Sequence, residues 1–135
     1  MRVWLLVSLV LAGCATSTPP ATSHHAHPAL APEGAPPPPL VDDLGTHHQA
    51  ITTASPRAQA YFDQGLRLVY AFNHVEAQRA FREAARLDPT CAMCYWGVAL
   101  TAGTNYNSPT DPARETVAWE AIQTARRLAD RATER

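Results

Sequence analysis

Two stretches with helical periodicity, enclosed by strong start and stop signals, constrain the fold more than any other feature of this sequence. Ser55-Pro56 provides a capping hydroxyl and then a proline at the first helical position, where the missing N–H costs nothing. Asp88-Pro89 ends the pattern, because the residue before a proline disfavours the helical conformation. Only a short interruption at Asn73 separates the two stretches, so they are expected to form an antiparallel helical hairpin.

Small and apolar side chains recur on one face of each predicted helix. Gly65 and Ala77 are expected where the two helices approach most closely, and larger side chains such as Phe81 should fill the space beside that contact. The stripes are Tyr61, Gly65, Leu68 and Phe72 in the first helix and Ala77, Ala80, Phe81, Ala84 and Leu87 in the second.

This hairpin resembles the tetratricopeptide repeat, a helix-turn-helix unit of about 34 residues. With Pro89 at the terminal proline of the motif, residues 58–91 form one repeat that departs from the pattern only at Gln64, where the motif prefers leucine. The resemblance implies an all-α fold of antiparallel hairpins. The matching positions are Tyr61, Gly65, Leu68, Ala77, Phe81, Ala84 and Pro89.

A second, altered copy of the repeat begins at residue 92. Adding 34 to Tyr61 and to Gly65 gives Tyr95 and Ala99. The second helix of this copy comes seven residues late, with its stripe at Ala118, Ile122 and Ala125. The delay indicates an insertion near 104–111, which Asp111-Pro112 ends as the cap and first turn of a final helix.

The insertion contains candidate contacts with a partner, because insertions in repeat arrays fall on one rim of the stack. These candidates are Asn105, Tyr106 and Asn107. In the alternative interpretation the asparagines cap helix ends and Tyr106 covers an apolar edge. About three repeats are usually needed for a stable array. The two repeats therefore suggest further repeats of a longer chain or pairing with another chain.

The first residues predict export. Arg2 precedes an apolar run at residues 3–12, which is much shorter than the roughly 20 residues that span a bilayer. Such a run is typical of a signal peptide. The following Leu-Ala-Gly-Cys, ending at Cys14, resembles the lipobox of bacterial lipoproteins. This resemblance implies that residues 1–13 are removed and that Cys14 carries the lipid.

A lipid on Cys14 would anchor the protein to a membrane, since each buried methylene adds about 0.8 kcal/mol. Ala15 stands where an aspartate would resemble an inner-membrane retention signal, so we expect the outer membrane, facing the periplasm. The stretch from His47 to Asn107 also resembles the opening of larger exported bacterial tetratricopeptide proteins. That resemblance brings no catalytic residues with it.

Residues 14–45 predict a disordered tether, and residues 46–135 hold the helical domain. The tether contains eight of the 12 prolines and has no apolar period, so it cannot build a core. Five histidines lie in or just beyond this tether and raise the question of a metal site. Without supporting contacts they indicate a solvated linker more than a ligand set. They are His24, His25, His27, His47 and His48.

Cys91 and Cys94 form a CxxC pair directly after Pro89, where one repeat meets the next. Export permits a disulfide, and a helix start lowers a thiol pKa, so a redox pair is one interpretation. However, redox CxxC motifs follow a strand in an alternating strand and helix pattern, and zinc needs a second ligand pair. The position favours structural cysteines at the junction, buried or disulfide-bonded.

No pattern in this sequence indicates catalysis, a cofactor or nucleic-acid binding. A formal net charge of -1 provides no basic face for nucleic acid. Asp63 and His74 could meet, but a histidine at a helix turn is more often capping or solvated. We therefore expect a lipid-anchored, non-enzymatic envelope scaffold that binds a protein or peptide. The alternative is a periplasmic thiol-disulfide or metal-handling protein that uses Cys91, Cys94 and the histidines.

Overall fold

The computed structural model describes residues 30, 32, 34–106 and 111–133. The regular secondary structure within these residues is helical, and they contain no strand. The expected all-α class is therefore confirmed. No helix within these ranges has the length and apolar character needed to cross a membrane. Cys14, the first three histidines of the expected tether and Asn107 lie outside the described residues. The elements are α1 (Pro56–Tyr70), α2 (His74–Leu87), α3 (Ala92–Ala102), α4 (Pro112–Leu128) and the short 3-10 helix η1 (Ala129–Arg131).

The helix starts lie where the capping residues predict them. Ser55 Oγ accepts a hydrogen bond from Ala58 N at 3.1 Å, and Pro56 opens α1. Asn73 caps α2 in the same way, and Asp111 caps α4 through the backbone N–H groups of its first turn. Each cap satisfies backbone donors that a helix leaves without an internal partner.

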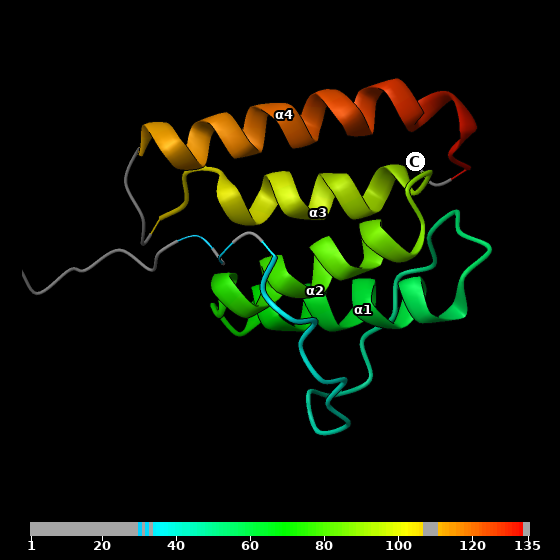
Figure 1. Cartoon of the computed structure of the whole chain (residues 1–135). Helices are drawn as coiled ribbons and strands as arrows, with labels where there is room; N and C mark the ends of the chain where they lie inside the picture. The colour runs from blue at the N-terminus through cyan, green and yellow to red at the C-terminus, as the bar shows by residue number, and fades with distance from the viewer. Residues whose placement is uncertain (1–29, 31, 33, 107–110, 134–135) are drawn as a thin grey trace, which may run out of the picture.

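The four helices form two antiparallel hairpins stacked side by side (Figure 1). Each helix packs against the next one along the chain, and a smaller contact joins α1 to α3. The α2–α3 contact is therefore the junction between the first hairpin and the second.

Phe81 on α2 fills the space where three helices meet. Its side chain is fully buried, and a Cβ atom added at Gly65 of α1 would lie 2.6 Å from Phe81 Cε1. On the other side, a Cβ atom added at Gly97 of α3 would lie 2.3 Å from Phe81 Cδ1. No real Cβ approaches another carbon so closely, so only glycine fits at either position. The close approach expected at Gly65 is thus an approach to this ring, and Gly97 provides its counterpart.

Arg114 connects α4 to the end of α3. Its side chain is buried, and its Nε donates to Ala102 O and its Nη2 to Thr101 O, each at 3.1 Å. These carbonyls belong to the last turn of α3, which has no internal donors left for them. The guanidinium group therefore completes the C-terminus of α3 and sets the start of α4 beside it.

The structure differs from the expected tether, which extended to Gly45. Tyr61 Oη donates to Pro38 O at 3.1 Å, and Pro38 itself is buried. Gln64, which is only 3% exposed, donates from Nε2 to Pro39 O and accepts at Oε1 from Val41 N, each at 2.9 Å. Composition predicted a solvated linker here because prolines cannot build a core. The chain packs instead through its backbone carbonyls, which proline retains.

We predict that Gly97→Ala lowers the free energy of unfolding by about 1–3 kcal/mol, because the new methyl group overpacks the ring of Phe81. At an open helical position the same change would stabilise by up to about 1 kcal/mol, so the sign identifies the cause. Urea unfolding followed by circular dichroism measures the difference. The double variant Gly97→Ala/Phe81→Leu should lose less than the sum of the two single losses. A stabilised Gly97→Ala protein would contradict the close contact.

Candidate functional site

Cys91 and Cys94 form a disulfide inside the α2–α3 junction. Cys91 is the N-cap residue of α3, and its sulfur accepts from Cys94 N at 3.1 Å. Both side chains are fully buried and belong to the hydrophobic core. Thiol-disulfide exchange needs an attacking thiolate to reach one of the sulfurs, and neither is open to solvent. The geometry assigns the pair a place in the packing between the hairpins.

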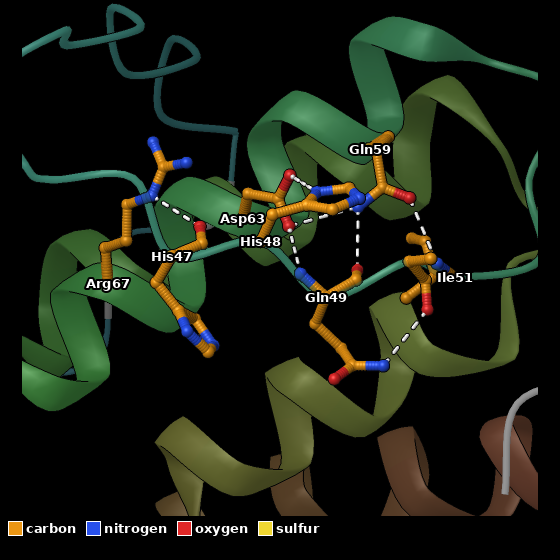
Figure 2. A network of polar contacts seen from close by, with 8 residues as sticks. His47, His48, Gln49, Ile51, Gln59, Asp63 and Arg67 are labelled. Carbon is orange, nitrogen blue, oxygen red and sulfur yellow. Dashed lines mark hydrogen bonds and ion pairs between the residues drawn. The ribbon is translucent and has the colours of Figure 1, made fainter.

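Three polar side chains of α1 hold the backbone of residues 47–51 (Figure 2). They are spaced four residues apart, which corresponds to a rise of about 6 Å on a helix. An extended chain rises about 6.6 Å in two residues, so successive side chains of α1 can meet every second residue of the segment. Arg67 Nε donates to His47 O at 2.8 Å, Gln49 N donates to Asp63 Oδ1 at 3.0 Å, and Ile51 N donates to Gln59 Oε1 at 3.0 Å.

Asp63 is the centre of this network. Its side chain is nearly buried, and Oδ2 lies 2.7 Å from His48 Nδ1. Its other oxygen also accepts from Gln59 Nε2 at 3.1 Å. The partner of Asp63 is thus His48 and not His74, whose Nδ1 lies 3.2 Å from Phe72 O at the turn. Nowhere in the described ranges do three metal-ligating side chains gather.

An apolar groove lies between α3 and α4, and we call it the α3–α4 groove. Two of its side chains are well exposed, with Leu100 at 40% and Trp119 at 64%. Exposed large apolar side chains that share one hollow indicate an interaction surface more than scattered single ones do. The groove is lined by Trp96, Ala99, Leu100, Thr104, Glu115, Ala118, Trp119 and Ile122.

The first hairpin has a counterpart of this groove, and there it is covered. Phe62 lies 34 residues before Trp96, and Phe81 lies 41 residues before Ile122, the same offsets that relate the two predicted repeats. Phe62 and Phe81 are both 0% exposed, their rings lie 5.5 Å apart in one core cluster, and Gly97 of α3 lies against the ring of Phe81. The α3–α4 groove therefore repeats, in an open form, the surface on which α3 sits in the first hairpin.

The predicted rim residues Asn105 and Tyr106 follow α3, in the first part of the insertion. Tyr106 is fully exposed and Asn105 is half-buried. The full exposure of Tyr106 contradicts the alternative in which this ring covers an apolar edge. Its ring is available to a partner, as the contact interpretation requires.

Two carboxylates near the α2–α3 junction have lowered pKa values. Thr53 Oγ1 donates to Asp88 Oδ2 at 2.5 Å, and this hydrogen bond is the main reason why the pKa of Asp88 falls below its ordinary value. The hydrogen bonds from Arg86 lower the pKa of Glu83. Lowered pKa values mean that folding favours both charged forms. Their stabilisation is fully present above the ordinary pKa values, at about pH 5 and higher, and is lost as the pH falls through the lowered values.

Comparison of the chain with known protein families, with curated proteins and with solved structures finds no match. The surfaces described above are therefore the features of this chain that bear on its function. These are the face of α1 that residues 47–51 cover, the open α3–α4 groove and the rim at Asn105 and Tyr106.

Sequence reasoning missed most of the groove and the network on α1. The signal for Trp96 was its position 34 residues after Phe62, but the first helix of the second copy was compared only at Tyr61 and Gly65. The signal for the docked segment was Gln64, a polar residue where the motif prefers an apolar one. Its amide is the group that binds the backbone on either side of Leu40.

We predict that Asp63→Ala frees residues 47–51 from α1 and lowers the free energy of unfolding by about 1–3 kcal/mol, because buried donors lose their acceptor. Nitrogen-15 relaxation provides the direct measurement. The order parameters of Gln49 and Ile51 should fall from about 0.85 to below about 0.6. Asp130→Ala, which removes an exposed acid in η1, is the matched control and should leave both values unchanged. A rigid segment in the Asp63→Ala protein would contradict this assignment.

Proposed function

We propose that this protein is a lipid-anchored scaffold of the cell envelope, in which two tetratricopeptide-type hairpins bind a protein or peptide partner without catalysis. One observation carries the proposal: the second hairpin leaves open the surface that the first hairpin covers with α3. An apolar hairpin surface of this kind is buried when a further helix packs on it, as neighbouring units of a repeat stack do.

The tetratricopeptide type is supported by the packing of the motif residues. Tyr61, Phe81 and Ala84 are buried together, and Gly65 makes room for the ring of Phe81. These are the positions at which the motif alternates large and small side chains between its helices. The departure at Gln64 is accounted for by its bonds to the N-terminal backbone.

Anchoring through Cys14 is proposed on the resemblance of its surroundings to a lipobox. In this proposal the lipid holds the chain on the outer membrane, facing the periplasm. The proline-rich residues after Cys14 then hold the hairpins away from the lipid surface. A disulfide between Cys91 and Cys94 agrees with an oxidising compartment.

Expression in a diderm bacterium tests the proposal, with a photo-crosslinking residue in place of Tyr106. The wild-type background should fractionate with the outer membrane and give a discrete crosslinked product. Cys14→Ala should leave a soluble or uncleaved precursor and abolish outer-membrane fractionation, because the chain then carries no lipid. The measurement is immunoblotting of the fractions before and after illumination.

Ala15→Ser is the matched control, since it changes the neighbouring residue and leaves the cysteine, and it should fractionate as wild type does. Outer-membrane fractionation of Cys14→Ala, as in the wild type, would contradict the lipid anchor. Absence of any crosslinked product at Tyr106 in correctly anchored protein would contradict the rim as a contact surface.

A further inference from the structure

The helix that covers the first hairpin defines what the open groove can hold. α3 is apolar along its whole length, AMCYWGVALTA, and lies over Phe62 and Phe81. It presents Gly97 to the largest side chain beneath it, where even a methyl group would not fit. The corresponding side chain in the α3–α4 groove is Ile122. A helix placed there in the same way needs a small residue above Ile122.

Charges at the two ends of the groove define a direction. Glu115, Trp119, Ile122 and Arg126 form one stripe along α4, with helical spacings of four, three and four residues. Glu115 and Arg126 are both exposed. α3 runs antiparallel to α2 (Figure 1). An equivalent helix would therefore run antiparallel to α4, with its first turn near Arg126 and its last turn near Glu115.

We propose that the α3–α4 groove binds an amphipathic helix of a partner protein, about three turns long and antiparallel to α4. This helix carries glycine or alanine at the centre of its apolar face, acidic residues in its first turn and basic residues in its last turn. That charge order pairs with Arg126 and Glu115 and also matches the helix dipole. The proposal rests on the proposed scaffold function and specifies the partner for one of its surfaces.

The contact that α3 makes with the first hairpin is the argument for a helix. The α3–α4 groove lies on the second hairpin at the place that corresponds to the surface under α3 on the first hairpin. A membrane surface has no fixed order of charges along a helix, whereas Glu115 and Arg126 carry opposite charges at the two ends of this stripe. A second copy of the chain could not offer its own α3, since the core face of that helix is already buried against α2.

The probe is a synthetic, fluorescein-labelled peptide with the α3 sequence, in which Cys94→Ala and Trp96→Leu remove the thiol and the indole. Two glutamates precede this sequence and two lysines follow it. The protein is the full chain in mild detergent with Trp4→Phe, which leaves Trp96 and Trp119 as its tryptophans. Both line the groove, so their fluorescence reports on its occupation. Peptide anisotropy gives the affinity.

We expect saturable one-to-one binding with a blue shift of the tryptophan emission, because both indoles lose contact with water. Trp119→Glu should weaken binding at least about tenfold, since it places a charge in the centre of the contact. Trp119 is 64% exposed, so this variant should fold normally, as circular dichroism would verify. A peptide with leucine at the central glycine should bind at least about tenfold more weakly.

Leu40→Glu is the matched control, because Leu40 is an exposed apolar residue outside the groove, and it should bind within about twofold of wild type. The Arg126→Glu variant should bind the original peptide more weakly than the wild type does. It should bind more tightly to a peptide in which the two end charges are exchanged. That exchange identifies the direction of the bound helix. If the wild type bound the two peptides equally well, whichever end carried the acidic residues, the orientation in the proposal would be wrong.

Three results would overturn the proposal. The first is that the peptide shows no saturable binding to the protein. The second is that the Trp119→Glu variant binds the peptide as tightly as the wild type does. The third is that the wild type sediments as a dimer and the Trp119→Glu variant as a monomer, which would show that a second copy fills the groove. Peptide binding depends on neither export nor lipidation. Failure here with normal fractionation and crosslinking at Tyr106 would refute the groove assignment alone, whereas failed fractionation with peptide binding would refute the anchor alone.

Discussion

The structure depends on the contact of one aromatic ring with two glycines. Phe81 on α2 lies against Gly65 of α1 and Gly97 of α3, so a single buried side chain fixes the position of three helices. The disulfide between Cys91 and Cys94 lies at the start of α3. Arg114 then connects α4 to the last turn of α3. Each later element is therefore positioned by the one before it.

The same arrangement divides the surface into a covered face and an open one. Along α1, polar side chains bind the backbone of residues 47–51 at every second residue, and Asp63 also contacts the side chain of His48 (Figure 2). Gln64 extends it to residues 39–41. On the second hairpin, Trp119 and Leu100 stay exposed in the α3–α4 groove. The chain thus covers its own first helix, whereas the α3–α4 groove is open among the described residues.

Local signals in the sequence predicted the helices well, and longer-range contacts limited the rest. Ser55, Asn73 and Asp111 act on the backbone within three residues, so the capping pattern alone placed the starts of α1, α2 and α4. Gly97 gave no such signal, because its role depends on Phe81, 16 residues earlier in the chain. The closeness of Gly97 to Phe81 follows only from the packing of α3 on α2.

The candidate sites illustrate the same limit. The pairing of His48 with Asp63 and the docking of residues 36–41 depend on the path of a proline-rich segment, which composition described only as unable to build a core. Gln64 broke the repeat pattern for this reason. The groove was accessible to sequence reasoning in principle, since the period that relates Phe62 to Trp96 also relates a covered position to an open one.

Native-state hydrogen exchange at increasing urea concentrations tests most directly whether Phe81 joins the two hairpins into one cooperative unit. The account predicts that slowly exchanging amides of α2 and α3 open with the same free energy, equal to that of global unfolding. If the amides of α3 and α4 opened together at a clearly lower free energy while α1 and α2 stayed protected, the contact of Phe81 with Gly97 would not hold the hairpins together, and the central claim would be wrong.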